Sequence, residues 1–290
     1  MRLDWADRTT VTGTAMLGRR IERRGTFGDQ NALDAGPAAY TEKQGALQIA
    51  RTGGQLELTG ELGIRKLDYS KDNAPAPEAP PGNNLRDVRQ EWFRVRVGVR
   101  SSERLALFTQ ARANRTAYEI ERTRDSKGFS LLAGARYDLT GRLVAEAALG
   151  YAQQDFTDPA ISDFKGIDFS LAASWTPTAR VRAELRGSRS VERSPLVGVA
   201  AVIQTSIEGA ASYALTSRVL AGIEAGVVRE SYRGIGRRDT RAYAEATARY
   251  NFTRSLSAFA GAGYTRQDGR GPGARQYDGA TFRIGLSFAP

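Results

Sequence analysis

Hydrophobic and polar residues alternate along most of the chain. From Leu143 to Tyr151 an apolar residue occupies every odd position. In WFRVRVGVR, which covers 92–100, Phe93 and the valines alternate with arginine and glycine, and TFRIGLSF at 281–288 has the same pattern. A period of two predicts β-strands that have one apolar face and one polar or mixed face.

The alternation predicts fourteen strands, each long enough to cross a membrane at a tilt. Short turns and longer connections follow each other in regular order between them. Short turns at one end and longer loops at the other are typical of outer-membrane β-barrels, and an even number of strands puts both termini on the short-turn side. The predicted strands cover 9–21, 39–51, 55–68, 87–100, 104–119, 127–139, 142–155, 164–176, 180–192, 200–215, 218–231, 240–251, 255–267 and 277–288.

A polar turn recurs at a fixed distance along the chain. Thr140, Thr178, Thr216 and Thr253 follow one another at steps of 38, 38 and 37 residues, and Ser102 lies 38 residues before Thr140. An aromatic residue precedes each of the four threonines by three positions. Each repeat holds two long runs, whereas a propeller blade would need four short strands, so the period indicates a repeated hairpin.

Proline is an independent test of these strands, because it has no N–H to donate to a central strand. All ten prolines fall in predicted connections or at the C-terminus. Pro177 is placed in one of the short turns, which is predicted over 177–179.

These patterns predict one domain over 1–290, an all-β, transmembrane, antiparallel up-and-down β-barrel of about fourteen strands, in a range of roughly 12 to 16. A barrel of this width is too large to fill with side chains, so its polar face would line water and its apolar face would contact lipid. An N-terminal extension is expected over 1–8 and a long Pro-rich external loop over 69–86. The alternative is a soluble β-repeat binding protein, in which the apolar face would form a core.

Aromatic residues lie at two equal heights in the predicted strands, which is the pattern of two interfacial girdles. One group lies near the short turns and the other lies eleven residues past a turn threonine. The predicted girdle residues are Tyr137, Trp175, Tyr213 and Tyr250 in the first group, and Tyr151 and Tyr264 in the second.

Composition narrows the chemistry. The chain has no cysteine and no histidine, so disulfides, zinc-thiolate sites and Ser-His mechanisms are excluded. We expect no enzyme activity, no catalytic residue, no metal and no cofactor. The formal net charge is +10, but the arginines occupy alternate strand positions and do not gather with aromatic residues on one platform, so we expect no nucleic-acid partner.

Charged residues on the polar face are the candidate functional residues. Near mid-height, arginines on the predicted strands four to six and glutamates on strands ten to twelve would face each other across a pore and tune its selectivity. Alternatively, these charges pair across neighbouring strands and stiffen the wall. The predicted pore-lining residues are Arg94, Arg96, Arg112, Arg136, Glu146, Arg182, Glu184, Arg186, Glu208, Glu224, Glu245, Arg249 and Arg283.

The T-x-R turns, the strand LVAEAALGYAQQDF, the following DPAISDFKGIDFSLAASWTPTARVRAELRGSRSVE and the closing aromatic-rich strand resemble the putative beta-barrel porin 2 family. The resemblance starts near residue 55 and is strongest over 127–288. Two features depart from the family: no signal or leader precedes the first strand, as expected of a trimmed chain, and the terminal aromatic Phe288 lies two residues before the end.

The resemblance implies a location in the outer membrane of Gram-negative bacteria, with outer-membrane lipid and lipopolysaccharide as partners. Several members of the family are encoded with exopolysaccharide synthesis and export systems, so the resemblance implies the outer-membrane part of a polysaccharide export system that works with periplasmic export or assembly components. A polar lumen is equally compatible with a conduit that passes small hydrophilic solutes. The alternative is a non-conducting structural or assembly-partner barrel with a plugged lumen.

Overall fold

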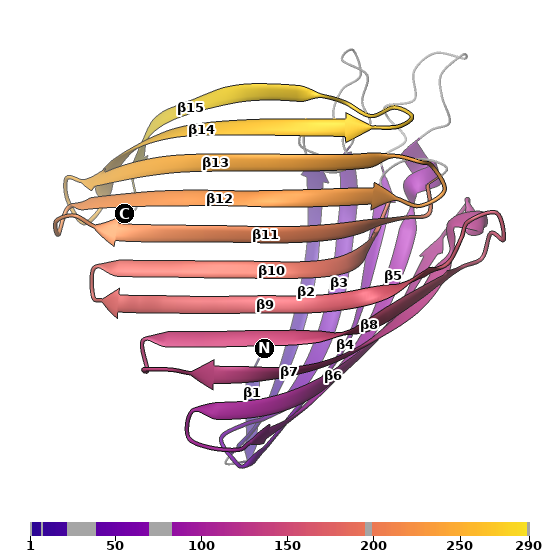
Figure 1. Cartoon of the computed structure of the whole chain (residues 1–290), viewed down its shortest axis with the longest axis horizontal. Helices are drawn as coiled ribbons and strands as arrows, with labels where there is room; N and C mark the ends of the chain where they lie inside the picture. The colour runs from indigo at the N-terminus through magenta and orange to yellow at the C-terminus, as the bar shows by residue number, and fades with distance from the viewer. Residues whose placement is uncertain (1, 7, 22–38, 70–82, 195–198, 289–290) are drawn as a thin grey trace.

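The chain forms a single antiparallel sheet. A computed structural model describes residues 2–6, 8–21, 39–69, 83–194 and 199–288. They form one sheet of fifteen strands that lie in the order of the chain (Figure 1). Two short 3-10 helices, η2 (Asn83–Arg86) and η3 (Arg122–Arg124), occupy connections. No helix in the described ranges is long and apolar enough to cross a membrane.

Fourteen of the strands have 12 to 15 residues and match the fourteen predicted strands one for one. A short additional strand, β1 (Arg2–Ala6), lies in the expected N-terminal extension and pairs with the next strand. The long strands are β2 (Thr9–Ile21), β3 (Ala39–Arg51), β4 (Leu56–Tyr69), β5 (Val88–Arg100), β6 (Leu105–Tyr118), β7 (Ser126–Asp138), β8 (Leu143–Phe156), β9 (Phe164–Thr178), β10 (Val181–Arg193), β11 (Ala201–Ala214), β12 (Val219–Tyr232), β13 (Arg238–Asn251), β14 (Leu256–Arg270) and β15 (Tyr277–Phe288).

The sheet is strongly curled, so that β2–β5 lie behind β9–β13 in Figure 1. Every strand pairs antiparallel with its neighbours in sequence, which confirms the predicted all-β, up-and-down architecture. The edges of the sheet are β1 and β15, and within the described residues β15 pairs only with β14. The sheet is therefore open along one seam. Most of the Pro-rich loop predicted over 69–86 lies outside the described residues.

The recurring threonine has a structural role in the short turns. In five turns the hydroxyl of Ser102, Thr140, Thr178, Thr216 or Thr253 accepts a hydrogen bond from the backbone N–H two residues further on, at 3.2 to 3.3 Å. Such side-chain bonds stabilise tight turns because they take the place of a missing backbone bond. The repeat read from the sequence is therefore a repeat of one turn structure.

The turn between β7 and β8 shows why one of these positions needs glycine. Gly141 has a φ of +68°, a left-handed conformation that side chains with a Cβ adopt rarely. The carboxylate of Asp138 accepts a hydrogen bond of 2.6 Å from the Gly141 N–H. Together, these two residues and Thr140 fix the direction in which β8 leaves the turn.

The position predicted for Pro177 was wrong. It lies within β9, which continues to Thr178, and not in the following turn. The register with β10 shifts between Val181 and Ala183 because β9 has an extra residue there. A bulge leaves one residue without a ladder bond, so it accommodates a proline inside a strand.

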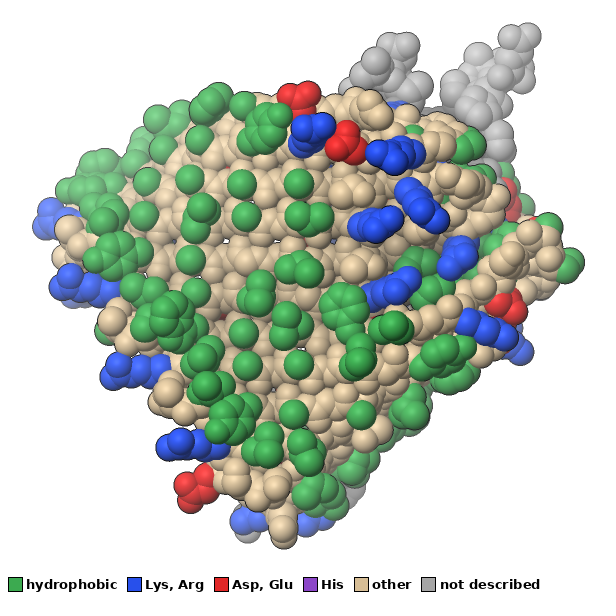
Figure 2. All heavy atoms as spheres, viewed as in Figure 1, with side chains coloured by type: hydrophobic (Ala, Val, Ile, Leu, Met, Phe, Trp, Pro, Cys, Tyr) green, Lys and Arg blue, Asp and Glu red, His purple; other side chains and the backbone are tan. Residues whose placement is uncertain are grey.

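The two faces of the sheet have opposite character. Among the described residues, forty large hydrophobic side chains are exposed and sixteen hydrophobic residues are buried. The buried ones form clusters of only three or four residues. On β15, Phe282 and Ile284 are 81% and 89% exposed. Figure 2 shows hydrophobic side chains spread in regular rows over the strands, with arginines and lysines toward both ends. A surface of this kind is stable against lipid but not against water.

The six predicted girdle aromatics all lie on this apolar face and are 40 to 49% exposed. In the register, Tyr137, Trp175, Tyr213 and Tyr250 each pair with the first residue of the preceding strand. Tyr151 and Tyr264 each lie eight residues after the first residue of their own strand. The aromatic side chains therefore lie at two levels, as interfacial residues do.

On the opposite, concave face, four aromatic rings lie over glycines. Each pair is directly opposed across two strands: Gly63 with Trp92, Gly134 with Phe108, Gly226 with Tyr243, and Gly285 with Phe259. A Cβ built on Gly63 would lie 2.1 Å from the Trp92 ring, and the other three would lie 2.6 to 2.8 Å from their rings. The ring thus occupies the space of the missing side chain and covers the exposed backbone.

We expect Gly63→Ala to destabilise the sheet by about 1–3 kcal/mol, because the added methyl group would overpack the Trp92 ring. Urea unfolding of the purified chain in detergent micelles measures the free energy of unfolding. Gly60→Ala on the same strand is the matched control, because nothing lies within 4 Å of its Cβ position. Equal losses of stability in the two variants would contradict this account of the aromatic–glycine pairs.

Candidate functional site

The concave face carries the charges that the sequence singled out. The strand register places all thirteen predicted pore-lining residues on the face opposite the apolar one, where they extend from β5 to β15. Because the sheet curls, this face surrounds a central space. Their role as pore-lining residues stays a prediction, but the strand register does place all of them on one face of the sheet.

One ion pair crosses two intervening strands. Arg96 of β5 donates two hydrogen bonds to the two carboxylate oxygens of Glu146 on β8, at 2.7 and 2.8 Å. The Arg96 guanidinium also lies 3.5 Å from the centre of the Phe108 ring. A bidentate pair of this kind has a fixed geometry. The pair can form only because the sheet is curved here, since β5 and β8 would be too far apart in a flat sheet.

Several other charges are paired locally. Glu184 accepts from Arg182 at 2.7 Å and from Arg186 at 2.8 Å on the same strand. Arg283 of β15 pairs with Glu245 of β13. In the described part of the chain, no carboxylate lies within ion-pair distance of Arg112, Arg136 or Arg249. Local pairing therefore accounts for part of the charge on this face but not for all of it.

Two like-charged pairs oppose each other in the register. Arg94 and Arg112 are direct partners across β5 and β6, and Glu224 and Glu245 are direct partners across β12 and β13. Like charges in such positions destabilise a sheet. Glu224 is relieved by a hydrogen bond of 3.3 Å from the Tyr243 hydroxyl, and Glu245 by Arg283. The concave face thus has a basic pair at β5–β6 and an acidic pair at β12–β13.

The end of the β10–β11 hairpin bends across the concave face. Pairing between β9 and β10 stops at Ser188–Ser170, whereas β10 and β11 remain paired as far as Arg193–Ala201. Beyond the point of separation, Ile203 packs into a buried cluster with Ala152 of β8 and Phe164 of β9. Local alternation along the sequence gave no sign of this bend, because it depends on contacts between strands that are distant in the chain.

A buried arginine holds this hairpin in place. Arg124 is 2% exposed and donates hydrogen bonds to the Val199 carbonyl at 3.1 Å and to the Ser194 carbonyl at 2.7 Å. Its guanidinium lies 4.0 Å from the centre of the Tyr118 ring, and Glu121 pairs with it at 2.8 Å. Arg124 therefore joins the β6–β7 connection to the end of the β10–β11 hairpin.

Two arginines flank the same region. Arg189 and Arg233 lie 5.4 and 5.3 Å from the centre of the Phe164 ring. Burial lowers the pKa of the Arg233 guanidinium, and the neighbouring Arg189 lowers it further. Arg233 therefore lies partly against protein, while Arg238 at the start of β13 and Arg270 at the end of β14 are exposed.

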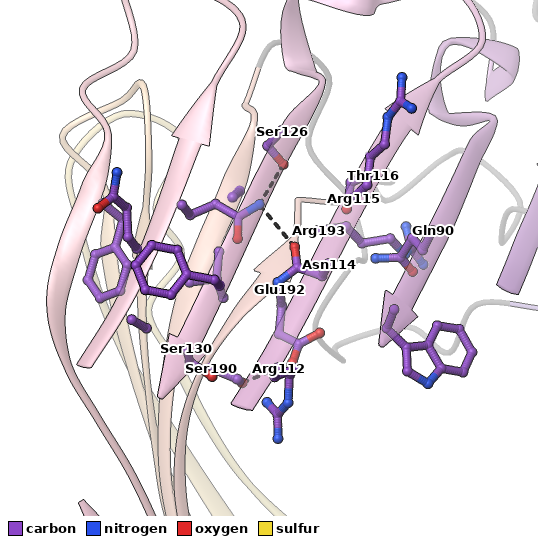
Figure 3. A pocket seen from close by; sticks show the side chains of 18 of the residues that line it. Gln90, Arg112, Asn114, Arg115, Thr116, Ser126, Ser130, Ser190, Glu192 and Arg193 are labelled. Atoms are coloured by element: carbon purple, nitrogen blue, oxygen red, sulfur yellow. Dashed lines mark hydrogen bonds between the residues drawn. The ribbon is translucent and has the colours of Figure 1, made fainter. Parts of the chain in front are cut away.

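Beneath the bent hairpin lies a cavity of about 390 Å³ (Figure 3). Six arginines and four carboxylates line it, with serine and amide side chains between them. Gln154 donates hydrogen bonds to Asn114 at 3.1 Å and to Ser126 at 3.0 Å. Most of the lining residues are not among the predicted pore-lining residues. Part of their signal is present in the sequence, since Glu61, Asn114 and Ser130 lie on the same side of their strands as the predicted charges.

The described residues contain no group of three or more Asp, Glu, His or Cys side chains arranged to hold a metal ion. The donors around the cavity are mainly guanidinium, hydroxyl and amide groups. Such groups bind anions and hydroxylated solutes.

The sequence model of one protein family, described as Putative beta-barrel porin 2, matches residues 1–289. The chain belongs to this family. No curated protein matches the chain. Membership in an outer-membrane porin family agrees with a curled antiparallel sheet that has an apolar outer face.

Solved structures similar to this chain include an iron transporter, a siderophore receptor and a ferric enterobactin receptor. The apoprotein form of the FrpB iron transporter from Neisseria meningitidis is 12% identical, with a TM-score of 0.58 over 92% of this chain and 50% of that one. The siderophore receptor PirA from Acinetobacter baumannii is 7% identical, with a TM-score of 0.54 over 99% and 63%. A mutant of the ferric enterobactin receptor PfeA from Pseudomonas aeruginosa is 10% identical, with a TM-score of 0.55 over 99% and 60%.

At these identities the likeness shows the fold alone, and the chain spans only 50 to 63% of the length of these proteins. Together with the family match, it places the protein among outer-membrane β-barrels of bacteria. The location predicted from the sequence is confirmed.

We expect Arg124→Ala to release the end of the β10–β11 hairpin. Ser194 is 1% exposed and the chain has no cysteine, so a single Ser194→Cys thiol reports on release. Loss of the charged hydrogen bonds to the two carbonyls should speed maleimide labelling of this thiol by about tenfold or more. Arg122→Ala, at an exposed position in the same short helix, is the control. Unchanged labelling with Arg124→Ala would contradict the holding role.

Proposed function

We propose that this protein is a water-filled conduit through the outer membrane for small hydrophilic solutes. The observation that carries the proposal is the division of the sheet into an apolar outer face and a charged concave face with arginines that lack ion-pair partners. Unpaired charges are costly in a dry interior, so water in the central space stabilises them. A water-filled lumen with charged walls admits hydrophilic solutes, because such solutes form polar interactions with the walls as water does.

A narrower form of the same proposal is passage of polysaccharide as the outer-membrane part of an export system. The family resemblance supports it, and periplasmic export or assembly components would then be partners. Outer-membrane lipid would cover the apolar face, and the exposed Arg238 and Arg270 would lie near lipopolysaccharide phosphates. We propose no enzyme activity for the concave face, because it offers guanidinium groups and carboxylates without a histidine or cysteine.

A second candidate is a structural or assembly-partner barrel that does not conduct. The bent β10–β11 hairpin favours it, because the hairpin occupies part of the central space. Arg124 and the buried cluster around Ile203 hold it there. Both candidates have the same fold. They differ in whether solutes pass through the barrel.

Reconstitution of the purified chain in planar bilayers separates the two candidates. A conduit should give discrete open-channel steps, and Arg124→Ala should raise their conductance by releasing the hairpin. Replacement of Arg94 or Arg112 by Ala should lower the preference for anions in a salt gradient, because each removes positive charge from the basic pair. Silent bilayers with both the wild type and Arg124→Ala would contradict the conduit and support the non-conducting barrel.

A further inference from the structure

The cavity beneath the β10–β11 hairpin contains arginine donors without partners. The Nε atoms of Arg94, Arg112 and Arg189 are buried, and none has a hydrogen-bond partner among the described residues. All three side chains line this one cavity. Buried N–H groups without acceptors are uncommon in folded proteins, and a bound ion or solute is one of their ordinary explanations.

The arginines come from three different strands and from two sides of the cavity. Arg94 of β5 and Arg112 of β6 are direct partners in the sheet, with like charges facing each other. Arg189 reaches the cavity from the bent end of β10, beyond the last β9–β10 pair. An anion between them would relieve the repulsion within the Arg94–Arg112 pair.

The carboxylates on the concave side of the cavity accept bonds from neutral donors. Glu61 accepts from the Trp92 indole N–H at 2.7 Å, and its bond from Arg94 is longer, at 3.4 Å. Glu192 accepts from the Ser190 hydroxyl at 2.9 Å, and Asp168 from the Ser130 hydroxyl. These three carboxylates therefore leave most of the arginine donors available.

The remaining lining suits a small polar solute. Figure 3 shows Arg112, Ser130, Ser190 and Glu192 around one space, with Asn114 above them. The volume of about 390 Å³ is within the range of small-molecule sites. Trp92 lies flat over Gly63 and forms part of the cavity wall, so its fluorescence reports on the contents of the cavity.

We propose that this cavity binds a small solute through an oxyanion group, a carboxylate or a phosphate, held between Arg94, Arg112 and Arg189. Arginine forms two parallel bonds to either group, and three guanidinium groups provide more donors than one such anion needs. The inference rests on the proposed conduit function, because it treats this cavity as a binding site on the route of the solute through the barrel.

Isothermal titration calorimetry on the full-length chain in detergent micelles tests the proposal. Three probes are used at low salt, where screening is weak: gluconate, inorganic phosphate and glucose. Saturable binding of gluconate or phosphate, with none of glucose, is expected, and the stronger of the two anions identifies the oxyanion. The same titration should change Trp92 fluorescence. Absence of binding by both anions, or equal binding of glucose, would overturn the proposal.

Arg112→Gln should weaken anion binding by about tenfold or more, because it removes charged hydrogen bonds. Arg186→Gln is the matched control, because this substitution removes the same charge from the same face of the sheet. Arg186 lies outside the cavity. Arg189→Gln, at the bent end of β10, provides a second variant if Arg112→Gln does not fold. Equal affinity in the wild type and in a folded cavity variant would overturn the assignment.

Failure of this inference and failure of the conduit can be told apart, because binding in micelles requires no transport. Anion binding with silent bilayers leaves the cavity assignment in place and removes the conduit. Open channels without anion binding remove the cavity assignment alone.

Discussion

Pairing of the backbone inside hydrocarbon is the constraint on which this structure depends. No water is available there to bond N–H and C=O groups, so a crossing strand must pair with neighbours on both sides. In this chain the long strands from β2 to β14 do so, each with the strands before and after it. Once the backbone is paired in this way, alternate side chains point to opposite faces. Lipid outside and water inside then require the period of two that runs through the sequence.

The concave face has a second requirement, which is to stay curved and hydrated while it carries many charges. Rings over glycines cover the backbone without filling the centre, and the Arg96–Glu146 pair spans two strands. Trp92 and Tyr243, like Phe108 and Phe259, are 151 residues apart, which is four hairpin repeats. At the same spacing Arg94 corresponds to Glu245. The repeat thus keeps the aromatic positions, while one member of the basic pair corresponds to one member of the acidic pair.

The strands and turns could be predicted from the sequence because their causes are local. A two-residue period sets each strand, and a threonine or serine two residues before a backbone N–H stabilises five of the short turns. Pro177 was misplaced because a bulge lets a proline lie inside a strand. The bend of β10–β11, the burial of Arg124 and the cavity could not be predicted in this way. They depend on where the sheet separates and on contacts between residues about seventy positions apart.

Alternating accessibility along one strand is the most direct test of the central claim, that one face contacts lipid and the other water. The absence of cysteine allows single cysteines at each position from Arg241 to Ala248 of β13, where the outward residues are all alanine. In liposomes, a hydrophilic maleimide should label positions 241, 243, 245 and 247 quickly and positions 242, 244, 246 and 248 slowly. Uniform labelling, or faster labelling at the alanine positions, would contradict the account.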